Sequence, residues 1–77
     1  MRSPRINVVG KILEGDDVGS LVKILNDADN TGGYLILVST EEEFVDGYDD
    51  WVENYKALKG YFEEANWVVD WEYQQVD

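Results

Sequence analysis

The chain has 77 residues and a formal net charge of −11, with 17 acidic and 6 basic side chains and neither histidine nor cysteine. It therefore lacks the imidazole and thiol groups that serve most neutral-pH catalysis and zinc binding. We expect a protein that binds and does not catalyse, without a cofactor or a metal site. We expect no direct binding of nucleic acid, because affinity for phosphates comes from Lys and Arg.

Length and hydrophobic content predict one folded domain over residues 1–77. Small chains bury a limited core, but 44% hydrophobic and 13% aromatic residues exceed what disordered segments carry. The absence of cysteine fits a reducing compartment, and no apolar run could span a bilayer. We therefore expect a cytoplasmic protein with no membrane association.

The N-terminal half predicts strands. Apolar residues recur over Ile6–Leu13 as in a strand, and the unbroken apolar run Tyr34–Val38 predicts a central strand buried on both faces. Ser20–Asn26 fits either a strand or a helix. A strand is favoured because Asp27–Gly33, which follows it, has the composition of a hairpin loop.

A short helical turn is expected after the central strand. Ser39 and Thr40 stand three residues before Glu42 and Glu43, which is the spacing of a capping box. Gly47 would end this turn.

The next predicted element is a long helix. Asp49 or Asp50 would cap it, and Asn66 would end it. Its apolar stripe has the 3.6-residue period of a helix and consists of Trp51, Val52, Tyr55, Leu58, Tyr61 and Phe62.

The C-terminal segment Trp67–Tyr73 alternates apolar and acidic residues, which predicts a half-buried antiparallel strand. The side chains expected on its buried face are Trp67, Val69, Trp71 and Tyr73. The order β-β-β-α-β predicts an α+β fold, with a small, mostly antiparallel sheet and one long helix packed on one face. A helical Ser20–Asn26 would give β-α-β-α-β instead.

Carboxylates are densest between Glu41 and Glu53, around the predicted start of the long helix. A helix N-terminus stabilises nearby anions by roughly 0.3–1 kcal/mol each, so capping explains part of this cluster. The remainder predicts a surface for the Lys and Arg side chains of a partner, with Tyr48 as an aromatic anchor for cation–π contacts. The predicted partner-binding residues are Glu42, Glu43, Asp46, Tyr48, Asp49, Asp50 and Glu53.

Three segments carry a resemblance to a known class of proteins: Thr31–Leu37 (TGGYLIL), Gly47–Glu53 (GYDDWVE) and Tyr61–Trp67 (YFEEANW). Over roughly Gly10 to Trp71, the chain resembles small acidic bacterial proteins of the immunity-protein type. The resemblance implies neutralisation of a nuclease-type toxin by direct binding. It implies no catalytic residues.

Charge and resemblance together predict an acidic inhibitor of a basic protein, an immunity or antitoxin-like protein that is a monomer or a homodimer. Two alternatives remain open. One is a phage-type DNA mimic, whose carboxylates occupy the basic groove of a nucleic-acid enzyme. The other is a self-associating structural domain whose charge confers solubility.

Overall fold

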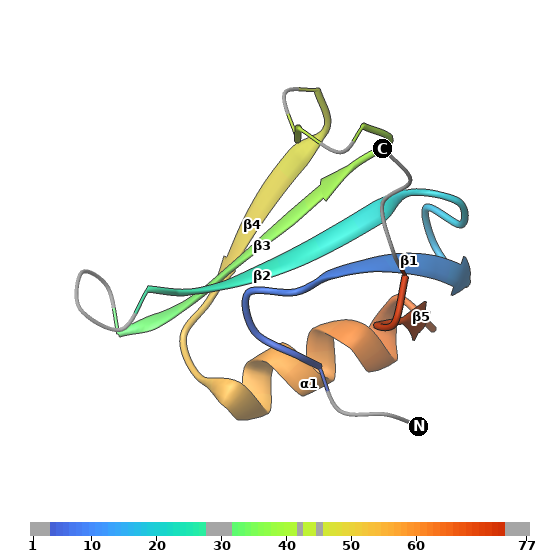
Figure 1. The fold of residues 1–77 in the computed structure, drawn as a ribbon. Helices are drawn as coiled ribbons and strands as arrows, with labels where there is room; N and C mark the ends of the chain where they lie inside the picture. The colour runs from blue at the N-terminus through green and yellow to red at the C-terminus, as the bar shows by residue number, and fades with distance from the viewer. Residues whose placement is uncertain (1–3, 28–31, 42, 45, 74–77) are drawn as a thin grey trace.

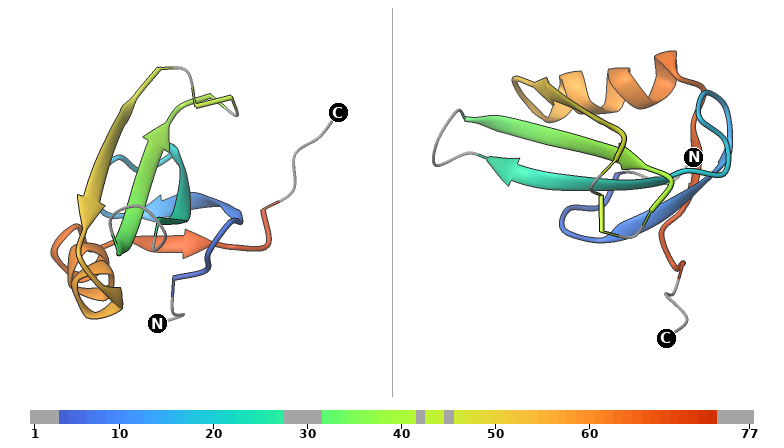
Figure 2. Two further views of the ribbon diagram at one scale, coloured as in Figure 1. Left: turned by 90° about the vertical axis from the view of Figure 1, so that its left-hand side faces the viewer. Right: turned by 90° about the horizontal axis from the view of Figure 1, so that it is seen from above.

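A computed structural model describes residues 4–27, 32–41, 43–44 and 46–73, which form a five-stranded antiparallel sheet with one helix on one face (Figures 1 and 2). The spatial order of the strands is β4-β3-β2-β1-β5, so β4 and β5 lie at the two edges. The elements are β1 (Val9–Glu14), β2 (Leu21–Asp27), β3 (Gly33–Ser39), β4 (Tyr48–Val52), α1 (Tyr55–Glu64) and β5 (Val68–Asp70). The predicted α+β class is confirmed. No helix within the described residues is long and apolar enough to cross a membrane.

The hydrophobic core lies between α1 and one face of the sheet. Alternate strand residues point to this face because successive side chains of a strand point to opposite sides. Phe62 contributes a ring whose centroid lies 5.0 Å from that of Trp67, in an edge-to-face arrangement. The core residues are Ile12, Val22, Ile24, Ile36, Val38, Leu58, Phe62, Ala65, Trp67 and Trp71.

The strand interpretation of the ambiguous N-terminal segment is confirmed. Strand β2 pairs with β3 over seven residues, from Leu21↔Ser39 to Asp27↔Gly33, so the alternative order β-α-β-α-β is wrong. Residues 28–31 of the predicted hairpin loop lie outside the described residues. Strand β3 is central, but Leu35 and Leu37 are only partly buried because no element of the described residues covers that face over them.

The predicted start of the helix is wrong. Residues 48–52 form β4, which pairs with β3 over five residues, and α1 covers only ten residues. Asn54 caps the helix, accepting a hydrogen bond from the Ala57 N–H at 2.8 Å. Trp51 and Val52 fit the 3.6-residue period of the helix that follows. They pair with β3, however, and therefore belong to an edge strand.

The short helical turn predicted after β3 is also not found in the described part of this loop. Ser39 ends β3, and its hydroxyl donates to the Asp46 carbonyl and accepts from the Glu41 N–H. In the same loop the Phe44 N–H donates to the Glu41 carbonyl at 3.1 Å, and Phe44 has a φ of 54°, outside the right-handed helical region. Ser39 therefore stabilises the loop and caps no helix.

Both terminal strands are shorter than predicted. The first begins at Val9, because Asn7 has a φ of 61° and Ile6 forms only an isolated bridge to Ile24. The last spans Val68–Asp70.

The flanking tryptophans of β5 are buried as expected, and Val69 packs against the core. Tyr73 departs from their face: its ring lies over Lys11, with the ammonium 6.0 Å from the ring centroid. The chain turns after Asp70, whose carboxylate accepts the Glu72 N–H at 3.0 Å.

The predicted end of the helix is confirmed. Asn66 has a φ of 57°, the left-handed conformation that commonly ends a helix. Its N–H donates to the Glu63 carbonyl and the Trp67 N–H donates to the Phe62 carbonyl, both at 3.1 Å. This pair of bonds is a Schellman motif, and it directs Trp67 into the core.

Candidate partner-binding site

The pleat of β4 divides the acidic cluster between two surfaces. Tyr48 and Asp50 pair with Val38 and Ile36, the β3 residues that face the helix. Asp49 pairs with Leu37 and therefore points to the opposite side of the sheet. Adjacent carboxylates in the sequence thus belong to different surfaces.

Two tyrosine–carboxylate pairs form on the helix side. The Tyr48 hydroxyl donates to Oδ2 of Asp17 at 2.5 Å, across 31 residues of sequence. The Asp50 carboxylate lies near the Tyr61 hydroxyl of α1 and accepts a hydrogen bond from the Trp51 N–H at 3.1 Å. These contacts join β4, α1 and the turn between β1 and β2.

A hollow of about 250 Å³ lies at this junction, lined by Asp16, Asp17, Tyr48, Tyr61, Glu64, Ala65 and Trp67. Asp50 adjoins it through Tyr61. We call the six polar residues Asp16, Asp17, Tyr48, Asp50, Tyr61 and Glu64 the acidic hollow. Four carboxylates and two phenols therefore converge from segments that are distant in the sequence.

The turn between β1 and β2 is fixed to the C-terminal end of α1. The Asp16 N–H donates to the Ala65 carbonyl at 3.0 Å, and Nε1 of Trp67 donates to the Asp16 carbonyl at 2.6 Å. Gly15 has a φ of 99°, and a Cβ there would overlap the carbonyl oxygens of Ala65 and Asn66. Only glycine permits this close approach, which positions the two aspartates beside the helix.

The charges along α1 oppose its dipole. A helix C-terminus carries a partial negative charge and is stabilised by cations. Here the last turn contains Glu63 and Glu64 and no basic residue, whereas Lys56 and Lys59 lie toward the other end. No lysine or arginine of the described chain lines the acidic hollow. Among the described residues, no cation therefore neutralises its negative charge.

Both phenols of the hollow remain protonated at neutral pH. Burial raises the pKa of Tyr48 above its ordinary value, and the hydrogen bond to Asp17 raises it further. Burial likewise raises the pKa of Tyr61, with a smaller contribution from Asp50. Each hydroxyl can therefore donate to a carboxylate and fix its position.

The remaining predicted residues do not join this group. Glu43, Asp46 and Glu53 are exposed outside the strands and helix, and Asp49 is exposed on the other face of the sheet. Glu42 lies outside the described residues. Of the six predicted residues that the structure describes, it brings only Tyr48 and Asp50 together.

Sequence reasoning missed four members of the acidic hollow: Asp16, Asp17, Tyr61 and Glu64. Asp16 and Asp17 lie in Glu14–Gly19, whose Gly and Asp residues indicate only a turn, and the helical period places Tyr61 on the apolar stripe. Their convergence depends on the docking of the turn against the helix. No pattern within a single segment of the sequence predicts the contact between this turn and the helix.

A larger hollow of about 560 Å³ lies at the other side of Trp67 and is mostly apolar. Leu13 and Val68 line it and are 49% and 43% exposed. Its only charged lining residues in the described chain are Asp70 and Glu72. It presents apolar surface without the convergent polar groups that give a ligand a defined orientation.

Among the described residues, no group of three or more acidic side chains is arranged to hold a metal ion. Comparison with family models, with curated proteins and with solved structures finds no match to this chain. Function must therefore be inferred from the chemistry of the surface.

Proposed function

We propose that this chain is an acidic inhibitor that binds a basic protein, of the immunity or antitoxin type, and neutralises a nuclease-like partner. The observation that carries this proposal is the acidic hollow, where four carboxylates converge without a cation in its described lining. Such an arrangement raises the free energy of the isolated protein, since like charges repel at a helix C-terminus that is already negative. A basic partner would remove that cost.

The geometry supports recognition of arginine in particular. The Tyr48 hydroxyl holds the Asp17 carboxylate and the Trp51 N–H holds that of Asp50, so less side-chain entropy is lost when a guanidinium binds them. Arg forms bidentate bonds with carboxylates and stacks on aromatic rings. Tyr48 is 43% exposed beside these carboxylates and can provide such a ring. The same basic side chains bind phosphates in a nuclease, so occupying them would block its substrate.

The test is a comparison of two charge-neutralised variants. Asp17→Asn with Asp50→Asn removes two charges from the hollow but keeps on each side chain an oxygen that can accept the existing hydrogen bond. Glu14→Gln with Glu41→Gln removes two charges from exposed positions elsewhere. Both variants have the same net charge, so only the location of the change differs.

Each protein would be immobilised and exposed to lysate at low and high salt, and the captured protein would be identified and purified. We expect wild type and the Glu14/Glu41 variant to bind the same basic protein and inhibit its nucleic-acid cleavage. The Asp17/Asp50 variant should bind about tenfold more weakly or worse. Equal binding and inhibition by all three proteins would refute the role of the hollow.

A further inference from the structure

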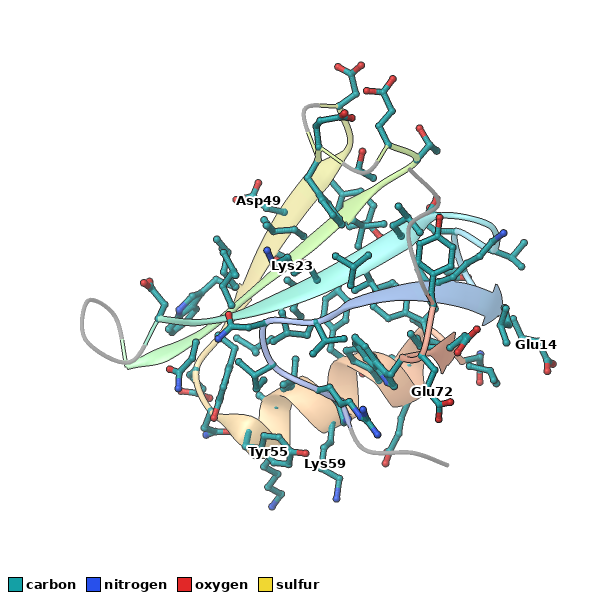
Figure 3. All side chains as sticks on the ribbon, viewed as in Figure 1. Glu14, Lys23, Asp49, Tyr55, Lys59 and Glu72 are labelled. Carbon is teal, nitrogen blue, oxygen red and sulfur yellow. The ribbon has the colours of Figure 1, made fainter. Side chains whose placement is uncertain are left out.

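The sheet face opposite α1 carries an apolar patch that no described element covers. Leu25, Leu35 and Leu37 are partly exposed there, and Trp51 is 45% exposed. Lys23 and Asp49 lie on the same face, as Figure 3 shows from the uncovered side. We call these six residues the open face. They are separate from the acidic hollow, which lies on the helix side.

The strand register arranges the open face in two rows across β2, β3 and β4. One row is Leu25–Leu35–Trp51, and the next is Lys23–Leu37–Asp49. Each row has leucine in the middle, on β3. In the second row, the two ends carry opposite charges.

The ammonium group of Lys23 forms no ion pair or hydrogen bond with the described residues. Its row neighbours are Leu37 on β3 and Val9 on β1, and the side chain is partly buried. Asp49 is two strands away, about 10 Å at the usual strand spacing, which is beyond an ion pair. A partly buried ammonium among apolar neighbours is stabilised if another molecule supplies a carboxylate.

We propose that the open face is a homodimer interface, in which a second copy packs with its two-fold axis parallel to β3. Such an axis places β2 of one copy against β4 of the other and β3 against β3. Lys23 then faces Asp49 of the second copy, and Leu37 faces Leu37. In the other row, Leu25 faces Trp51 and Leu35 faces Leu35. The patch is therefore complementary to itself in both charge and hydrophobicity.

Charge balance favours this face over the rest of the surface. From β1 to β4, this side of the sheet carries Lys11 and Lys23 against Asp27 and Asp49, whereas the whole chain carries −11. Association through any acidic surface would bring like charges together. Six side chains are fewer than the roughly 20–30 residues per partner of a stable interface, so we expect a dimer with a dissociation constant in the micromolar to millimolar range.

Salt dependence distinguishes this association from the binding of a basic partner. Two copies repel through their net charge, and salt screens that repulsion. The dimer should therefore strengthen as salt is added, whereas the complex with a basic protein should weaken. The two proposals concern different surfaces, and either can fail alone.

The test is sedimentation equilibrium of the purified protein up to millimolar concentration, with a charge exchange between the two positions. Lys23→Glu and Asp49→Lys should each weaken the dimer about tenfold, because each places like charges opposite one another. The double variant exchanges the two charges and keeps the wild-type net charge. It should recover the wild-type dissociation constant to within about threefold.

Lys59→Glu on α1 is the matched control for Lys23→Glu, with the same net charge and an exposed position away from the open face. It should leave dimerisation within about twofold of wild type at high salt. A monomer at all concentrations would overturn the proposal. If the double variant is folded but does not recover the wild-type dissociation constant, the predicted pairing of Lys23 with Asp49 is wrong.

Discussion

Strand β4 contributes residues to both the acidic hollow and the open face, but only the open face also contains a basic residue. Tyr48 and Asp50 of β4 contribute to a hollow whose carboxylates have no cation in the described lining. Asp49 and Trp51 contribute to a face where Asp49 and Lys23 carry opposite charges on either side of Leu37. The hollow therefore suits a basic partner, and the open face suits a copy of itself.

The net charge of the chain does not indicate how charge is distributed between these two surfaces. A strand turns successive side chains to opposite sides, so a run of acidic residues on a strand is shared between two surfaces. What distinguishes the surfaces is the tertiary neighbour of each carboxylate. A tyrosine hydroxyl fixes Asp17, whereas leucine lies beside Asp49.

Of the substitutions that test the difference between the acidic hollow and the open face, Gly15→Ala should have the largest effect on stability. A Cβ at Gly15 would overlap two carbonyl oxygens at the end of α1, and its φ of 99° strains any other residue. We expect a loss of about 2–4 kcal/mol in the free energy of unfolding, measured by urea denaturation. The acidic hollow should open while the open face keeps its pairing.

Gly19→Ala is the matched control for this experiment. Gly19 lies in the same connection with a φ of 93°, but a Cβ there would meet nothing within 4 Å. Its cost should be only the backbone strain, about 1 kcal/mol. If the two variants are equally destabilised, close packing of the turn on the helix does not hold the hollow together.

Trp67→Phe should have the next largest effect. The substitution removes the indole N–H that donates to the Asp16 carbonyl at 2.6 Å, and it leaves space in the core where Trp67 is 2% exposed. We expect a loss of about 1–3 kcal/mol in thermal or urea unfolding. An unchanged stability would show that the bond to Asp16 does not fix the turn.

Tyr48→Phe tests the hydrogen bond that distinguishes the hollow from the open face. Loss of the bond to Asp17 should cost about 0.5–1.5 kcal/mol at neutral pH. The folded pKa of Tyr48 is raised, so its contribution is fully present below the ordinary tyrosine pKa of about 10. The contribution is lost as pH rises through the higher folded pKa.

The measurement is urea unfolding of wild type and Tyr48→Phe across the alkaline range. Wild type should lose stability with rising pH more steeply than the variant, because only wild type has the raised Tyr48 pKa. Parallel curves for the two proteins would show that Tyr48 titrates normally in the fold.

The parts of the fold that sequence predicted are those set by local patterns. Continuous apolar residues identified β3, and the loop composition after β2 favoured a strand over a helix, as the structure confirms. The left-handed Asn66 ended the helix where expected. Each of these features depends on residues within one turn or one strand.

The parts that sequence could not predict depend on tertiary pairing. Trp51 and Val52 fit the helical period, and only pairing with β3 makes them a strand. That error moved the predicted helix cap from Asn54 to Asp49 or Asp50 and placed the acidic cluster on one surface. The acidic hollow was missed for the same reason, since Asp17 and Tyr48 meet only in the folded chain.

The smallest effect should be a gain. Glu64→Lys places a cation at the C-terminal end of α1, where the helix dipole favours positive charge, and removes a carboxylate from the hollow. We expect about 0.3–1 kcal/mol of added stability at low salt, decreasing as salt is raised. Association with the basic partner should slow at the same time.

Glu63→Lys separates these two consequences. Glu63 lies in the same last turn of α1 and is exposed, but it does not line the hollow. Both variants should gain similar stability, since both change the same charge near the same helix end. Only Glu64→Lys should strongly reduce the association rate. If both variants slow association equally, the partner responds to the overall field of the protein, and the hollow is not its binding site.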